Sequence, residues 1–513
     1  MLHHAQPNVV ISQKPFVRIV FSVALVAVLA AIAFAMGSSW LASEQSLKIV
    51  VAVFLLLVPL YFVLAAAKAR AADTNAVTFR LTLLLWWFLL ISDELFDRIS
   101  NAQGMYQGQF SSDAYGEVVT WVVAFVVLLI ISLARPGYLK QMFSGSYKWV
   151  SLFILSCLVS AVYSPSPLYS LGWAFKLFVV GLVLRLCISC MRSLKDARAL
   201  FWATLWALLF VAILSLGEAF ADPTRLFAGV GGRLNADPVV LSATAACLLM
   251  VTLTLNSIQR RLFLIPIGLF SVFVMIFAFG KTGLLAGLAS ATVFFLLQRK
   301  VASSIGMLAG VGMLAAVLLA TVTPLGNYVK LYRGAGTLTG RTELWEKAIP
   351  AIKQRSLMGH GYLASKFMWT TQTGRYAEAG HLHNGFLETL YSNGVIGLAF
   401  LLLIHAAILT NLFYAKKAIS RAGPLKAGGI SAADLRVGNV LVVGSVALYL
   451  NLFINGLFTF AFGGRANIQF MMFLSLLGVS MVLRQWAAPL TVRHNTLPQR
   501  APTERPHVLV PIA

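Results

Sequence analysis

Long apolar segments, separated by short polar connections, recur along the whole chain. Several hold about 18 or more apolar residues, which is enough for an α-helix to cross about 30 Å of hydrocarbon. None shows the regular alternation of apolar and polar positions that an outer-membrane strand requires. The pattern therefore predicts an all-α fold and a polytopic integral membrane protein. We expect the transmembrane helices at residues 16–36, 47–67, 77–92, 117–134, 149–163, 168–190, 198–220, 238–256, 260–279, 282–298, 303–321, 384–413, 437–460 and 465–484.

The segments 77–92 and 149–163 are short for a span, and the pair within 260–298 can be divided differently, so we expect about 12–14 transmembrane helices. The first segment, 16–36, is long enough to span and has no clear small-residue cleavage site after it, so we expect no cleavable signal peptide. Composition agrees with this class of protein, because 59% of the 513 residues are hydrophobic, 11% are charged and the mean hydropathy is +0.83. A soluble domain is about half apolar and about a quarter charged.

Basic residues gather in alternate connections, which sets the orientation of the bundle. They occur within residues 68–80, 135–148, 192–198, 260–261, 299–300, 416–436 and 484–500. By the positive-inside rule these connections face the cytoplasm and the others face the periplasm. The net charge of +23 then reflects mainly topology. Because the basic residues are dispersed over many short turns, we expect no nucleic-acid partner.

One connection, residues 322–383, is much longer than the others and lies on the periplasmic side by the same alternation. Loops of this length are usually functional or disordered, and this composition is not that of a disordered segment. We therefore expect four parts. These are an N-terminal transmembrane bundle of about 11 spans (1–321), a large periplasmic loop (322–383), C-terminal transmembrane helices (384–484) and a polar cytoplasmic tail (485–513).

Within the large loop, the string TGRTELWEKAIPAIKQRSL predicts an amphipathic helix. Its apolar residues share one stripe at helical spacing, with acidic residues in the first turn and basic residues near the end. We expect this helix to lie on the outer membrane surface, with Trp345 at the headgroups and a kink at Pro350. The alternative is a packed extracellular lid without chemistry. The stripe consists of Leu344, Trp345, Ala348, Ile349 and Ile352.

The string GHLHNGFLETLYSNGVIG, which begins at residue 380, opens the next span and carries two histidines. On a continuous α-helix, Gly394 and Gly397 fall within about 40° of His383 around the axis. Glycines on this face would let a neighbouring helix approach closely. His383 would then stand at the outer end of a tight helix pair. If the helix already includes His381, that side chain would point away from this face.

Five cationic residues are expected on the periplasmic side, against the positive-inside trend. A single one is explained as a snorkelling anchor, but five together indicate a bound anion. Guanidinium groups suit phosphate because they are planar, permanently charged and bidentate. A neutral histidine beside them would keep a depressed pKa and act as a base near pH 7, which predicts transfer chemistry on a phosphate-linked lipid. The five are Arg225, Arg233, Lys281, Arg341 and Arg465.

Other motifs have structural interpretations. The string GKTG at 280–283 lacks the first glycine of a nucleotide-binding P-loop and faces outward. The four cysteines all lie in spans and are expected to be structural thiols. His360, His381 and His383 lack a convincing carboxylate or thiolate set, so we expect no metal site. His405, within a span, is expected to be a hydrogen-bonded structural histidine.

The string GRTELWEKAIPAIKQRSLMGHGYLASKF, followed by AGHLHNGFLETLYSNGVIGL, resembles the O-antigen ligase and polymerase superfamily, which includes the exopolysaccharide polymerases. In that family a Gly-Arg and a tryptophan open the large periplasmic loop, a Gly-x-Gly follows, and a His-Asn, nine further residues and GxxG close it. The resemblance is specific over about residues 335–400 and weaker elsewhere. The matching residues are Gly340-Arg341, Trp345, Gly359-His360-Gly361, His383-Asn384, Gly394 and Gly397.

The resemblance implies a glycosyltransferase of the bacterial inner membrane whose active face is periplasmic. Its donor would be a glycan on undecaprenyl diphosphate, and its acceptor a sugar hydroxyl of another lipid-linked repeat or of lipid A core. Membrane lipids and other polysaccharide assembly and export proteins would be its further partners. Likeness of GRTELW and HLHNGF to exopolysaccharide polymerases favours a polymerase of repeat units over a ligase.

The resemblance also implies roles for individual residues. His383 would deprotonate or orient the acceptor hydroxyl, and Arg341 with Arg225 or Arg233 would stabilise the diphosphate leaving group. Which of those two arginines matches the family's earlier loop stays open, and no metal or other cofactor would be needed. Lys281 and Arg465 would also bind the diphosphate. Supporting roles fall to His381, Asn384, Trp345, Gly394 and Gly397.

A transporter of lipid-linked glycans is the alternative from another functional class. Such a protein lines its middle with ionisable residues and usually shows repeated halves. Lys176 is the clearest charge in the middle of a span, and no internal repeat is visible. We expect Lys176 to snorkel or to reach the lipid phosphate rather than to line a path.

Overall fold

The computed structural model describes residues 74–99, 121–122, 124–126, 128, 141–221, 238–278, 280–322, 341–368, 381–422, 431–459, 461–464 and 466–496, and the structure of these residues is given below. The predicted spans at 16–36 and 47–67 lie outside them, and the span at 117–134 is described only in part. Every regular element within the described ranges is helical.

The α-helices match the predicted spans closely along the described chain. Seven helices of these residues are long and apolar enough to cross a membrane, and shorter apolar helices accompany them. The prediction of an all-α, polytopic membrane protein is confirmed. In chain order the helices are α3 (Thr74–Ile99), α7 (Lys148–Ser160), α8 (Pro167–Cys190), α9 (Leu194–Ala221), α11 (Pro238–Gln259), α12 (Leu264–Phe277), α13 (Lys281–Leu297), α14 (Val301–Val322), α16 (Arg341–Gln354), α17 (Ser365–Met368), α18 (Gly385–Ala422), α19 (Ala432–Phe458) and α20 (Ile468–Thr496).

The division of 260–298 into two spans corresponds to α12 and α13. The C-terminal boundary differs from the expectation, because α20 continues past Arg484 and the expected tail at 485–513 begins inside a helix. Trp486 packs on Gly438 of α19, where an added Cβ would lie 2.5 Å from the indole ring. This packing carries the helix beyond the charged residue at which hydropathy ends the span.

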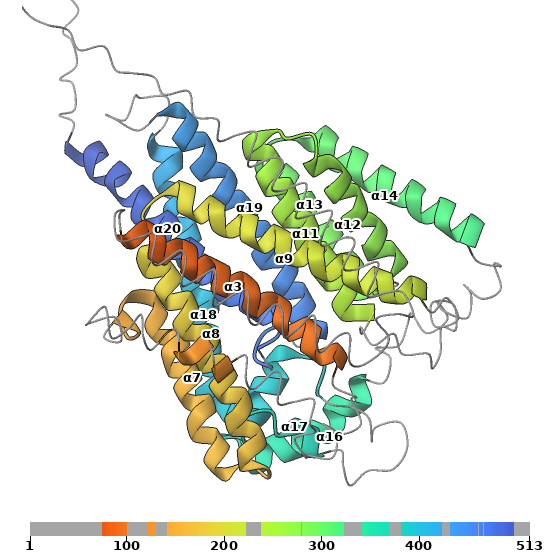
Figure 1. Cartoon of the computed structure of the whole chain (residues 1–513), viewed down its shortest axis with the longest axis vertical. Coiled ribbons are helices and arrows are strands. Elements are labelled where there is room, and N and C mark those ends of the chain that lie inside the picture. The colour runs from red at the N-terminus through yellow and green to blue at the C-terminus, as the bar shows by residue number, and fades with distance from the viewer. Residues whose placement is uncertain are drawn as a thin grey trace, which may run out of the picture.

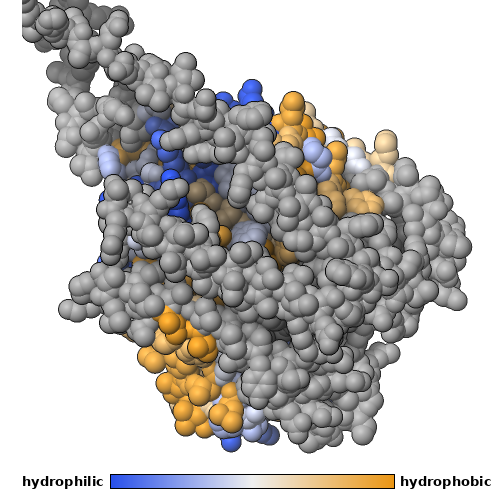
Figure 2. All heavy atoms as spheres, in the orientation of Figure 1, coloured by the Kyte–Doolittle hydropathy of each residue, from blue (hydrophilic) through white to orange (hydrophobic). Residues whose placement is uncertain are grey.

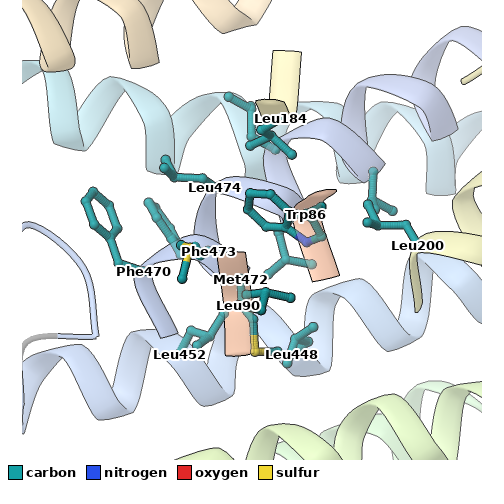
Figure 3. Packing of buried hydrophobic residues seen from close by; sticks show 14 of the residues in the cluster. Trp86, Leu90, Leu184, Leu200, Leu448, Leu452, Phe470, Met472, Phe473 and Leu474 are labelled. Carbon is teal, nitrogen blue, oxygen red and sulfur yellow. The ribbon is translucent and has the colours of Figure 1, made fainter. Parts of the chain in front are cut away.

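The core of the bundle forms around α20, which packs against α18 and α19. Figure 3 shows Phe470 and Phe473 of α20 among side chains of α19 and α3, including Leu452 and Trp86. In Figure 1, α16 and α17 lie together at one end of the bundle. Both contact α18, so the described part of the large loop packs at this end. We call it the loop end.

The outside of the bundle is apolar as well. Figure 2 shows hydrophobic side chains gathered over the region of α7 and α8. Val159, Val162 and Leu168 of this region are exposed by 48%, 80% and 74% of their surfaces. Apolar surface on this scale is stable in contact with lipid rather than water.

The helix α18 is interrupted near the loop end. At Gly394 the backbone has φ 63° and ψ −164°, which divides α18 into a short segment, residues 385–393, and a long one. An added Cβ at Gly394 would collide with the Leu357 carbonyl group. Gly359 has φ 73°, and a Cβ there would lie 2.6 Å from the Gly394 nitrogen. The two glycines therefore allow two backbones to touch.

Residues 356–361 of the large loop, called the strap below, fill this interruption. The strap and the broken turn exchange backbone hydrogen bonds, each donating two and accepting two. The bonds are His360 N to Tyr391 O (2.8 Å), Gly361 N to Ser392 O (2.9 Å), Val395 N to Ser356 O (2.8 Å) and Ile396 N to Leu357 O (3.4 Å). Backbone groups that the break frees are thus satisfied by protein, as they must be in a membrane-spanning helix.

The strap changes the role expected for the two glycines of α18. Gly394 was expected to face a neighbouring helix, but it contacts the strap. Gly397 does face α7, since an added Cβ would lie 3.7 Å from Ser156 Oγ, although the Asn393 side chain is nearer. The expected common face assumed a continuous helix, and the break at Gly394 removes that assumption.

The amphipathic helix of the large loop is α16, and most of its apolar stripe packs against the protein. Only Ile349 of the stripe is largely exposed, at 43%. Trp345 is half-buried, and its Nε1 donates a hydrogen bond to the Leu382 carbonyl (2.9 Å). A position of Trp345 at the headgroups stays a prediction. A small second core joins Leu344, Ala348 and Ile352 to Ala364, Leu382 and Tyr391.

Candidate active site

His383 stands just before α18 rather than on it. The helix begins at Gly385, and Asn384 caps it, because Asn384 Oδ1 accepts hydrogen bonds from the nitrogens of Phe386 and Leu387 (both 3.0 Å). Asn384 Nδ2 also donates to the Leu457 carbonyl at the end of α19 (3.0 Å). His383 itself has φ 52°, in the left-handed region that is costly for a residue with a side chain.

The peptide groups of Leu382, between the two histidines, are held from both sides. The Leu382 nitrogen donates to Glu388 Oε2 (3.0 Å), and the Leu382 carbonyl accepts from Trp345 Nε1 (2.9 Å). The Leu382 side chain is completely buried. Together with the Asn384 cap, these contacts fix the backbone on both sides of His383.

His381 and His383 face each other, with ring centroids 4.1 Å apart. His381 was expected to point away only if the helix includes it, and this condition is not met, because residues 381–384 are not helical. Burial, and then the nearby Arg341 guanidinium, lowers the pKa of His383 from 6.5 to about 4. Burial, His383 and Arg341 hold the pKa of His381 well below its usual range. Both imidazoles are neutral at pH 7, and Arg341 is close to both.

Glu388 lies one turn into α18 and is fully buried. Its Oε1 accepts hydrogen bonds from Ser365 Oγ (2.5 Å) and Ser392 Oγ (3.3 Å), and its Oε2 accepts from the Leu382 nitrogen. This carboxylate joins α17, α18 and the backbone between the histidines. A carboxylate at the start of an apolar span is a signal in the sequence, yet Glu388 was not among the expected site residues.

Lys366, next to Ser365 on α17, is a second residue that was not expected. It is 8% exposed, and its Nζ lies 4.7 Å from the centre of the Tyr169 ring. Burial lowers the pKa of Lys366 from 10.5 to about 8. Lys366 is thus a buried cation in the large loop. It directly follows Ser365, which donates a hydrogen bond to Glu388.

The remaining expected phosphate-binding residues are not brought into this site by the described contacts. Lys281 is exposed as the first residue of α13. Arg225, Arg233 and Arg465 lie outside the described residues. Their part in binding a diphosphate stays a prediction.

Lys176 is neither at a span end nor snorkelling. It is 2% exposed, and its Nζ lies 4.9 Å from the ring centres of both Trp121 and Trp173. Cation–π attraction of this kind stabilises a buried ammonium group. Among the described residues, no group of three or more His, Cys, Asp or Glu side chains is arranged to hold a metal ion.

The chemistry available at the loop end follows from these contacts. The Arg341 guanidinium attracts an anion. The neutral imidazoles of His381 and His383 accept protons or hydrogen bonds. An interrupted helix whose N-terminus faces an anionic ligand is a recurring arrangement in membrane proteins. The site can therefore bind an anionic substrate next to a proton acceptor.

Comparison with known proteins finds a family match over this region and a similar curated protein. Residues 266–402 match the model of a family described as O-antigen ligase, a range that includes α16, the strap and both histidines. The chain is also similar to the exopolysaccharide production protein ExoQ of Rhizobium meliloti (strain 1021), with 29% identity over 182 residues. That alignment covers 28% of this chain and spans 42% of the length of ExoQ.

Proposed function

We propose that this chain polymerises lipid-linked repeat units of an exported polysaccharide, a proposal supported by the match of residues 266–402 to the O-antigen ligase family and by the similarity to ExoQ. The donor is an oligosaccharide on undecaprenyl diphosphate, and the reaction takes place on the periplasmic face of the bacterial inner membrane. The observation that carries this proposal is the cationic Arg341 beside two neutral histidines at the start of an interrupted helix.

In this reaction Arg341 binds the donor diphosphate. His383 accepts the proton of the acceptor hydroxyl while that oxygen attacks the anomeric carbon of the donor. The bond from that carbon to the phosphate oxygen breaks, and undecaprenyl diphosphate leaves with the bonding electrons. The proton then passes from His383 to solvent.

The pKa of about 4 in the free protein makes His383 a weak base. A bound diphosphate reverses part of this effect, because a neighbouring anion favours the imidazolium form. The donor therefore raises the pKa of His383 at the moment when a base is needed. Arg341 carries the charge that a divalent cation would otherwise neutralise, so chelation should leave the rate unchanged.

Transfer of the glycan to lipid A core is the second candidate, favoured by the description of the matched family as O-antigen ligase. Purified protein supplied with an undecaprenyl-diphosphate repeat alone should form a ladder of chain lengths. A ligase would instead leave single repeats and consume them only when lipid A core is added. A protein that moved the repeat between leaflets of a vesicle without forming either product would be a transporter.

Orientation is tested separately by cysteines placed at Ser100, Thr373 and Gly428. The first two should react with an impermeant thiol reagent from the periplasm, and Gly428→Cys should not. Labelling of Gly428→Cys in intact cells would place the large loop in the cytoplasm, where the proposed donor is not presented.

A further inference from the structure

The proposed reaction does not use Glu388, although it is the fully buried carboxylate nearest in sequence to the histidines. A buried carboxylate is expensive unless its oxygens are satisfied. Here both oxygens accept hydrogen bonds, and the donors are two hydroxyls and one peptide nitrogen. These donors satisfy the hydrogen-bonding capacity of the buried side chain.

The three donors come from different segments of the chain. Ser365 belongs to α17, Ser392 belongs to α18, and Leu382 lies between the histidines. The contact with Leu382 matters most for chemistry, because the same residue is held at its carbonyl by Trp345. Glu388 and Trp345 thus hold the Leu382 peptide from both sides, and we call this arrangement the clamp. Trp345 is one turn along α16 from Arg341, so the clamp connects the histidine segment to the helix that carries the arginine.

The clamp also explains how His383 keeps a costly backbone conformation. A left-handed φ is costly in a residue other than glycine and persists only where the surroundings impose it. At His383 the surroundings are the Leu382 peptide on one side and the Asn384 cap on the other. Loss of either side would let the backbone relax and would turn the imidazole.

We propose that Glu388 is a positioning residue, which holds His383 in its reactive orientation through the Leu382 peptide. This inference rests on the proposed function, because it needs His383 to take part in the transfer. Glu388 does not touch the substrate in this scheme. Its removal should therefore lower kcat and leave the KM for the donor nearly unchanged.

The main variant is Glu388→Gln, which keeps the size of the side chain but replaces one acceptor oxygen with a donor NH2 group. Because the Ser365 hydroxyl can also accept, the amide can keep both contacts, but its hydrogen bond from the Leu382 nitrogen loses the charge of the carboxylate and is weaker. We therefore expect kcat to fall by about 3- to 10-fold. Glu346→Gln, the same change on an exposed part of α16, is the matched control and should have no effect.

Trp345→Phe tests the other half of the clamp without touching the carboxylate. It keeps an aromatic ring but removes the Nε1 donor to Leu382, so kcat should fall in the same direction. This variant also keeps the test open if Glu388→Gln yields too little folded protein. Normal kcat in Trp345→Phe would then contradict the clamp.

A double-mutant cycle separates positioning from a general structural effect. If Glu388 acts through His383, the double variant Glu388→Gln/His383→Gln should be no slower than His383→Gln alone. Multiplied losses, or normal kcat in Glu388→Gln at normal protein levels, would overturn the inference. Full activity in His383→Ala would instead contradict the proposed role of His383, so the two failures are distinguishable.

Discussion

Two histidine sites near α18 show how surroundings decide what the same side chain does. His383, at the loop end, stands before the helix beside Arg341 and His381. His405, inside the long segment of α18, is 5% exposed, and its Nδ1 pairs with the Tyr449 hydroxyl (2.9 Å). The rings of Phe462 and Phe473 lie 4.7 Å and 4.5 Å from the His405 ring.

The surrounding side chains, more than the residue type, distinguish a catalytic candidate from a structural histidine. His405 is enclosed by aromatic rings, and its hydrogen bond satisfies a polar atom in the core. This agrees with the structural role expected for it. His383 has a cation and a second imidazole beside it, and the cation favours an anionic ligand.

The largest expected effect comes from removing the imidazole at each site. His383→Ala should lower polymer formation per folded protein by about 10²–10⁴-fold, because the proton acceptor is lost while the cations remain. His405→Phe should keep the rate and lower stability by about 1–3 kcal/mol, because the Tyr449 hydroxyl loses its partner. Equal rate losses in His383→Ala and His405→Phe would contradict the different roles assigned to the two histidines.

His381→Ala sharpens this test. The sequence alone predicts less damage from His381→Ala than from His383→Ala. Because the two ring centroids lie 4.1 Å apart, we expect His381→Ala to lower the rate measurably, but by less than His383→Ala does. Losses as large as those of His383→Ala would indicate that the imidazoles act as one unit.

Arg341→Lys should have the next largest effect. Lysine keeps the positive charge but loses the bidentate fork for phosphate. We expect a drop in kcat/KM of at least about tenfold, or roughly 1.4 kcal/mol. Lys347→Arg on an exposed part of α16 is the control. Unchanged turnover of Arg341→Lys would assign α16 a lid role only.

Gly394→Ala tests whether the interruption of α18 is needed to build the loop end. The added Cβ meets the Leu357 carbonyl and φ stays positive, so the free energy of unfolding should fall by at least about 1–3 kcal/mol. Gly397→Ala, at a position with negative φ, meets mainly a side chain and should cost less. The measurement is the yield and thermal stability of detergent-purified protein. Equal stability of the two variants would contradict the role of the strap.

The smallest expected effect concerns the dependence of kcat/KM on pH. Burial and Arg341 lower the pKa of His383 to about 4, so kcat/KM should stay level from about pH 8 to about pH 5 and fall below it. Because the unfolded chain binds this proton more tightly, His383 also destabilises the fold as pH drops from 6.5 toward 4.

Arg341→Gln removes the cation, so the pKa of His383 and the acid limb of kcat/KM should both move upward. His405→Phe should leave that limb in place. In the wild type, the acid limb of kcat should lie above that of kcat/KM, because the bound diphosphate raises the pKa. An acid limb that does not respond to Arg341→Gln would show that His383 does not control it.

The membrane class, most of the spans and the residues of the loop end follow from the sequence alone. Hydropathy is a local quantity, so α8, α11 and α19 were predicted within a few residues of their observed bounds. The motif that contains Arg341, Trp345 and His383 was also visible as a string. The extension of α20 past Arg484 was not, because packing of Trp486 on α19 decides it.

Only the tertiary structure decided how the motif residues work. Helical periodicity placed His383 and Gly394 on one face of a continuous helix, whereas the strap breaks that helix and His383 precedes it. The break depends on hydrogen bonds between segments about 35 residues apart in sequence, such as His360 to Tyr391. The clamp of Leu382 between Glu388 and Trp345 depends on the same packing. Such pairings are non-local, and no periodicity within one segment encodes them.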